Sequence, residues 1–171
     1  EMFKAGEFKG LVPEGVIDSK GELKNPFFFI WSDLNNDGKV QTNELDVRPG
    51  VNGGITVQPD FSFCIARFGA EKEPKKAMRF KPAGFTDKGV PKYDFSKGEA
   101  LAENVHGPAS SGGDQMLVDD AGNVVVTLGI SPFHSHSISG GRNGVATWSY
   151  PSLWPGLHAS HEAPKPKFPG E

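Results

Sequence analysis

The stretch FFFIWSDLNNDGKVQTNE, residues 27–44, contains the pattern around which the rest of the chain is organised. Its first five residues, Phe27 to Trp31, follow a proline and are aromatic or β-branched. This composition predicts a β-strand, and not a helix, before the residues that follow. Because the run is almost continuously apolar, we expect the strand to be buried on both faces.

The next twelve residues, 33–44, match the calcium loop of EF-hands. Gly38 occupies the sixth position, where the backbone turns sharply and a Cβ would be costly. Three carboxylates this close in sequence repel one another unless a cation lies among them. The predicted Ca²⁺ ligands are the side chains of Asp33, Asn35, Asp37 and Glu44, together with the backbone carbonyl of Lys39.

An acidic Asn/Asp/Gly turn without an ion is the alternative interpretation of this loop. After the loop, residues 42–47 can form one helical turn before Pro49-Gly50 ends it. The pattern therefore predicts a strand, a calcium loop and a short helix. It favours an ion that stabilises the loop over a sensor that opens a groove.

The composition indicates a single β-rich domain over residues 1–171. The chain is long enough for a substantial core, and its 22 glycines and 14 prolines favour short strands joined by turns. A net charge of -3 and dispersed basic residues argue against a nucleic-acid partner. No apolar run is long enough to span a membrane. The single cysteine, Cys64, excludes an internal disulfide and lies in an apolar strand pattern, so we expect a buried, inert thiol.

The remaining pattern is all-β. The clearest hairpin joins residues 115–119 and 123–127 across Asp120-Ala121-Gly122. We expect a helical turn over 99–103, a turn over 140–144, and a proline-rich extended tail over 151–171. The other predicted strands are residues 55–58, 61–68, 77–81, 134–139 and 145–150.

Four stretches carry a resemblance to a known family. They are residues 31–44, 80–94, the hairpin turn 118–123, and GVATWSYPSLWPGLHASH at 144–161. Together they resemble secreted bacterial NHL-like β-propeller proteins that carry an EF-hand-type calcium loop. The resemblance implies blades of antiparallel strands. At roughly 40–50 residues per blade, the chain would be part of a larger propeller. Further blades or another chain would complete this propeller. A homo-oligomer, in which the other chain is a second copy, is one such arrangement.

Histidines supply a second candidate metal site. His134 and His136 alternate on a predicted strand and would face the same side. His158 and His161 lie three residues apart in the tail. Four such imidazoles suit Zn or Cu, and packing of the rings against aromatic side chains is the alternative. The sequence contains no motif for covalent haem, a nucleophile elbow, a phosphate loop or a dinucleotide site.

These features favour a secreted, calcium-binding, non-enzymatic protein of binding or assembly, located outside the cell or in the periplasm, where calcium is plentiful. The alternative is a propeller enzyme, of lyase, hydrolase or lactonase type, that uses the histidines or acidic residues. A third class is a surface protein that assembles by strand addition at open sheet edges.

Overall fold

The computed structural model describes residues 2–70, 72–107, 114–133 and 137–151, and these residues are mostly β-structure. All the helices in this part are short 3₁₀ turns, and none is long and apolar enough to cross a membrane. The helical turns are η1 (Met2–Lys4), η2 (Glu7–Leu11), η3 (Thr42–Glu44) and η4 (Phe95–Lys97). The strands are β1 (Phe27–Trp31), β2 (Leu45–Pro49), β3 (Val51–Asn52), β4 (Ile55–Val57), β5 (Phe63–Gly69), β6 (Lys75–Phe80), β7 (Gly84–Phe85), β8 (Pro91–Lys92), β9 (Glu99–His106), β10 (Met116–Val118), β11 (Asn123–Val126), β12 (Gly129–Ile130), β13 (Ser137–Arg142) and β14 (Val145–Pro151).

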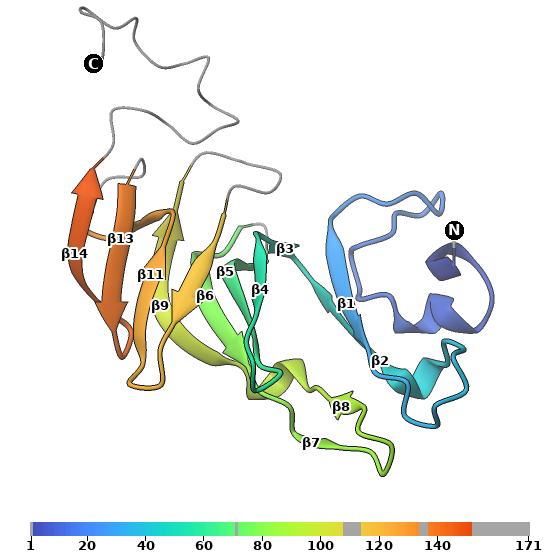
Figure 1. Cartoon of the computed structure of the whole chain (residues 1–171). Coiled ribbons are helices and arrows are strands. Elements are labelled where there is room, and N and C mark those ends of the chain that lie inside the picture. Colours follow the sequence, from blue (N-terminus) through green and yellow to red (C-terminus); the bar gives the residue numbers. More distant parts are fainter. Residues whose placement is uncertain (1, 71, 108–113, 134–136, 152–171) are drawn as a thin grey trace, which may run out of the picture.

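The strands form antiparallel sheets arranged in layers (Figure 1). The hairpin β1-β2 lies on one side of a six-stranded sheet whose order is β12-β9-β6-β5-β3, with β4 also paired to β5. A four-stranded sheet, β10-β11-β13-β14, lies on the other side. The small pair β7-β8 extends from the end of the six-stranded sheet.

Strand β5 divides the core in two because its side chains alternate between the two faces of the sheet. Cys64 and Ala66 point into a cluster shared with β9, β10, β11 and β12. Phe63 and Ile65 point the other way, into an aromatic cluster with Phe80. The six-stranded sheet is therefore the middle layer, buried on both faces.

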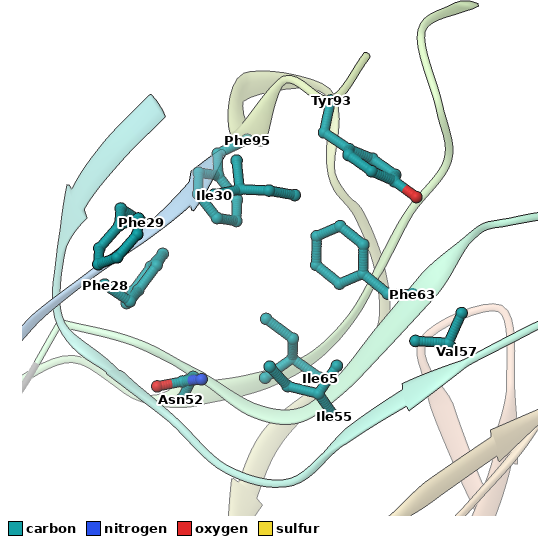
Figure 2. A pocket seen from close by; sticks show the side chains of 10 residues that line it. All are labelled: Phe28, Phe29, Ile30, Asn52, Ile55, Val57, Phe63, Ile65, Tyr93 and Phe95. Atoms are coloured by element: carbon teal, nitrogen blue, oxygen red, sulfur yellow. The ribbon is translucent and has the colours of Figure 1, made fainter. Parts of the chain in front are cut away.

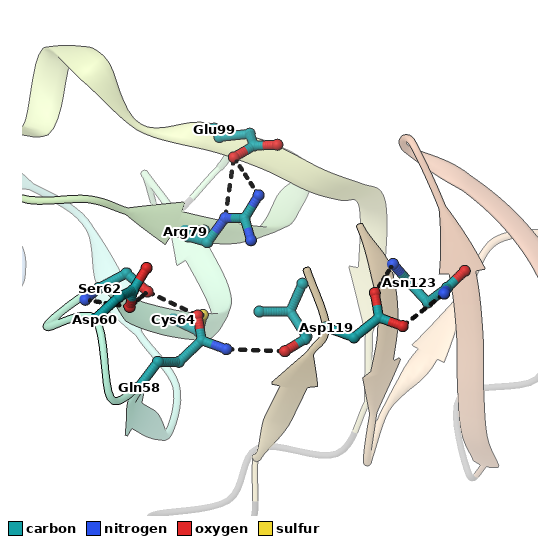
Figure 3. A network of polar contacts seen from close by, with 9 residues as sticks. Gln58, Asp60, Ser62, Cys64, Arg79, Glu99, Asp119 and Asn123 are labelled. Carbon is teal, nitrogen blue, oxygen red and sulfur yellow. Dashed lines mark hydrogen bonds and ion pairs between the residues drawn. The ribbon is translucent and has the colours of Figure 1, made fainter. Parts of the chain in front are cut away.

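The six- and four-stranded sheets approach closely where Gly54 meets Asp114. A Cβ on Gly54 would lie 1.6 Å from the carbonyl oxygen of Asp114, so no side chain fits there. The Asp114 side chain, 2% exposed, lies 2.7 Å from Arg67 Nη2. At the other end of the contact, the Gln58 amide donates to the carbonyl of Val118, 2.8 Å away (Figure 3). Polar contacts at both ends thus join the two sheets across their shared apolar core.

Several predicted elements are confirmed. The strand over residues 27–31 has the predicted bounds, and the hairpin around Asp120-Ala121-Gly122 forms from β10 and β11 with Leu117 opposite Val125. The strands over 55–58 and 61–68 form as β4 and β5, and 77–81 as β6. The strand over 145–150 forms as β14.

Three local predictions are wrong. Residues 99–103 form part of β9, because this segment pairs with β6 and buries Leu101 and Ala102. The turn predicted over 140–144 forms only at Asn143 and Gly144, because residues 140–142 belong to β13. A Cβ on Gly140 would come 2.3 Å from the Trp148 ring, so this glycine makes room for an indole. Burial of β1 on both faces is also wrong, since Phe29 is 49% and Trp31 39% exposed.

The Asp119 carboxylate at the predicted hairpin turn has a shifted pKa that a titration can measure. The Asn123 side-chain amide and backbone N–H donate to the Asp119 carboxylate at 2.6 and 2.8 Å (Figure 3), and these bonds lower its pKa from the usual 3.8. Because the folded pKa is depressed, the associated stability is present above pH 3.8 and is lost as pH falls through the folded value. We expect an NMR titration of Asp119 to show a midpoint below 3.8. In an Asn123→Ala variant the midpoint should rise, and an unchanged midpoint would contradict the assignment.

The prediction of a buried Cys64 is confirmed, since the free thiol is 0% exposed. Burial raises the pKa of the thiol from 9.0 to about 11. The reactive form is the thiolate, so we expect the native protein at pH 8 to react with a disulfide reagent only after unfolding. Absorbance of the released thiol would follow the reaction with and without urea. Rapid labelling of the native protein would show that this strand opens.

Candidate functional site: the loop between the first two strands

The loop of residues 33–44 connects β1 to β2, and the hairpin brings its two ends together. Trp31 lies opposite Leu45 in the register, and the N–H of Ser32 donates to the carbonyl of Glu44 at 3.0 Å. Of the helical turn predicted over residues 42–47, only residues 42–44 form, as the 3₁₀ turn η3 at the end of the loop, and residues 45–47 belong to β2 instead. The loop is therefore flanked by two paired strands, and the predicted arrangement of strand, loop and short helix is confirmed up to Glu44.

The first half of the loop wraps around Asp33. The backbone N–H groups of Asp37 and Gly38 donate to its two carboxylate oxygens at 3.1 and 3.0 Å. This turn requires left-handed backbone at Asn36 (φ 61°) and Gly38 (φ 71°), a conformation that glycine and asparagine adopt most readily. The glycine predicted for the sharp turn is in the expected conformation.

The middle of the loop is an exposed network of side-chain oxygens and amides. The Asn35 amide donates to Asp37 at 3.2 Å and to Gln41 at 3.1 Å, and the Gln41 amide donates to Asp37 at 2.8 Å. The Lys39 backbone N–H donates to Asp37 Oδ1 at 2.8 Å, so its peptide group belongs to the same network. Four of the predicted ligand residues, including Asp33, thus lie in one hydrogen-bonded loop.

Glu44 is the buried member of the set, with a side chain only 4% exposed. Its Oε1 accepts the backbone N–H of Leu34 at 2.8 Å and that of Asn35 at 3.4 Å, while its Oε2 accepts the Trp31 indole N–H at 3.0 Å. Lys92 and Glu44 both line a small hollow beside β1, but Lys92 forms no ion pair with the Glu44 carboxylate. In the described part of the chain, every polar partner of this carboxylate is a neutral donor.

The chemistry of the loop fits a hard cation, because its side chains offer carboxylate and amide oxygens. The carboxylates of Asp33, Asp37 and Glu44 are nevertheless not drawn together. Within the described ranges, no three His, Cys, Asp or Glu side chains form a metal-binding group. Each carboxylate is instead held by N–H donors of the loop and its flanking strand.

The histidine site predicted from the sequence lies outside the described residues, which include none of His134, His136, His158 and His161. His106 is described. It ends β9, opposite Gly129 of β12, as part of a strand pair.

Two features of this region were not identified from the sequence. One is the hydrogen bond from the Trp31 indole N–H to Glu44. The sequence signal for this bond was a tryptophan at a strand end, because its indole N–H needs an acceptor. The other is an open apolar hollow of about 220 Å³ between β1 and the middle sheet (Figure 2). Phe28 and Ile30 form one wall of this hollow, and Phe63, Ile65 and Tyr93 lie around it. The strand that precedes the loop therefore also shapes the aromatic core.

The strand after the loop is fixed to the same core. Asp46 of β2 accepts the backbone N–H of Phe95 at 2.9 Å, which joins the hairpin to η4. Phe95 packs in turn against Phe28, with ring centroids 5.1 Å apart. The strand that follows the loop is therefore held against the aromatic core.

Comparison with known proteins gave no match to a family model, to a curated protein or to a solved structure.

Proposed function

We propose that the loop of residues 33–44 binds Ca²⁺ and that the ion stabilises the β1-β2 layer. The burial of Glu44 carries this proposal. An ionised carboxylate that is 4% exposed is costly unless it is paired with a cation. None of the ion pairs among the described residues includes Glu44, Asp33 or Asp37. A divalent cation would supply the missing positive charge.

The residues that would hold the ion are those predicted from the sequence. The carboxylates of Asp33, Asp37 and Glu44, the Asn35 side chain and the Lys39 carbonyl offer the hard oxygens that Ca²⁺ prefers. When bound, the ion would neutralise three carboxylates and cross-link the two ends of the loop. Because paired strands flank the loop, this role is structural and involves no opening of a helix pair.

We further infer a secreted β-propeller-type protein of binding or assembly. Two observations support this: the antiparallel sheets are layered, and the outer face of the four-stranded sheet is apolar. Leu117 is 68%, Ile138 47% and Tyr150 74% exposed on this face. Such a face suits a further blade or another chain that covers it. Plentiful calcium outside the cell or in the periplasm agrees with a structural ion.

Calorimetric titration of the purified chain with CaCl₂ tests the calcium proposal. We expect one binding site, with affinity lowered by about tenfold or more in Glu44→Gln, which keeps the shape of the side chain but removes its charge. Glu103→Gln is the matched control, because Glu103 is 54% exposed on β9 and pairs with Lys76. Absence of binding by the wild type at millimolar calcium would refute the proposal.

Sedimentation velocity at several protein concentrations tests the assembly proposal. A mass that rises with concentration would support coverage of the apolar face by another copy. A monomer at all concentrations would leave further blades of a longer polypeptide as the covering partner.

A further inference from the structure

We propose that Trp31 is a positioning residue of the calcium site, because its indole N–H holds the Glu44 carboxylate in place. This inference rests on the proposed calcium binding, and it assigns a role to a residue that provides no ligand atom. The juxtaposition that carries it is the 3.0 Å bond from Trp31 Nε1 to Glu44 Oε2.

The bond is well placed for this role because Trp31 and Glu44 lie at the two ends of the loop. Trp31 is the last residue of β1, and Glu44 is the last residue of η3, directly before β2. The backbone bond from Ser32 to the Glu44 carbonyl, 3.0 Å long, fixes the main chain beside it. The indole then fixes the side chain, so both parts of Glu44 are anchored to the strand that precedes the loop.

The bond leaves Glu44 free to coordinate an ion. A carboxylate offers about four lone-pair positions on its two oxygens. Oε2 accepts only the indole N–H, and Oε1 accepts the N–H of Leu34 with a longer contact to Asn35. Oε2 therefore retains a free lone-pair position for an ion, whereas both positions on Oε1 already accept N–H groups. A neutral donor that orients a ligand without competing for it is the usual arrangement behind metal ligands.

Burial makes the orientation effective. Glu44 is 4% exposed, so water cannot easily replace a lost donor. Trp31 is 39% exposed and lies on the side of β1 away from the Phe28 and Ile30 core cluster. Removing the indole should consequently disturb Glu44 more than it disturbs the hydrophobic core.

The test compares Trp31→Phe with Trp148→Phe by calorimetric titration with CaCl₂. Trp148 is a matched control, since it is 38% exposed and packs against Tyr150 on β14. We expect calcium affinity to fall by about 10- to 100-fold in Trp31→Phe and to stay unchanged in Trp148→Phe. Without calcium, the melting of Trp148→Phe should resemble that of the wild type, whereas Trp31→Phe should melt at a modestly lower temperature because the buried Glu44 carboxylate loses a donor.

A second measurement follows the indole N–H signals of the wild type by NMR. In ¹H–¹⁵N spectra of the wild type, the Trp31 indole signal should move during a calcium titration with the dissociation constant found by calorimetry, and the Trp148 signal should stay still. The chain has three tryptophans, so the Trp31→Phe and Trp148→Phe variants together assign these two indole signals.

The outcomes separate the two proposals. If the wild type binds calcium and Trp31→Phe binds it equally well, or if the Trp31 indole signal does not move, the positioning role is overturned while calcium binding stands. If the wild type binds no calcium, both proposals fail.

Discussion

Calcium at one hundred times its dissociation constant is expected to raise the free energy of unfolding by about 2.7 kcal/mol. For a chain of 171 residues, this corresponds to a rise in melting temperature of roughly 5–10 °C. The physical reason is that the unfolded chain cannot assemble the oxygens of Asp33, Asp37 and Glu44 around one ion. Binding therefore stabilises the folded state alone. Thermal melting followed by circular dichroism, with calcium and then with excess chelator, measures the shift.

The Glu44→Gln variant provides the control for this prediction. Its melting temperature should respond little to calcium, because the buried charge that attracts the ion is gone. Magnesium at the same concentration should stabilise the wild type less, since Mg²⁺ demands octahedral geometry and dehydrates reluctantly. Identical melting curves for the wild type in calcium and in chelator would contradict a structural ion.

Replacing Phe80 with alanine is expected to lower the free energy of unfolding by about 3–5 kcal/mol. Phe80 is 1% exposed and stands at the centre of the aromatic cluster. Its ring stacks on Phe63 at 5.0 Å and contacts Phe68 and Phe95 at 5.3 and 5.2 Å. Truncation would leave a cavity between the middle sheet and the β1-β2 layer. Urea unfolding followed by fluorescence measures the loss.

Phe85→Ala is the matched control, because Phe85 is 48% exposed on β7 and contacts the ring of Phe61. Its cost should be about 1 kcal/mol. Equal effects of the two substitutions would show that the aromatic cluster is not the core of this layer. A calcium response that is lost in Phe80→Ala but kept in Phe85→Ala would show that the loop depends on this packing.

Local patterns predicted much of the chain correctly, and the reason is visible in particular residues. The hairpin at Asp120-Ala121-Gly122 formed as expected because its turn residues tolerate the backbone that the turn needs. The loop after Trp31 turns at Gly38 for the same reason. Both features depend on interactions within about twelve residues, so the sequence pattern contains the information for them.

Predictions failed where distant neighbours determine the conformation. Residues 99–103 contain good helix formers, yet they extend as β9 because they pair with β6. Gly140 was interpreted as a turn residue, but it is extended beneath the ring of Trp148, a contact that spans a hairpin. Tertiary pairing outweighs local propensity in both cases.

Sequence patterns alone were enough to predict the β class, the bounds of the first strand and the turn of the loop at Gly38. These depend on side-chain alternation, turn chemistry and spacing along the chain. Three features became visible only in the folded chain: Glu44 is buried against Trp31, Cys64 and Phe63 face different cores, and Asp46 joins β2 to Phe95. The physical reason is that burial and pairing depend on which surfaces meet in space, and many sequences with the same local pattern can bring different surfaces together.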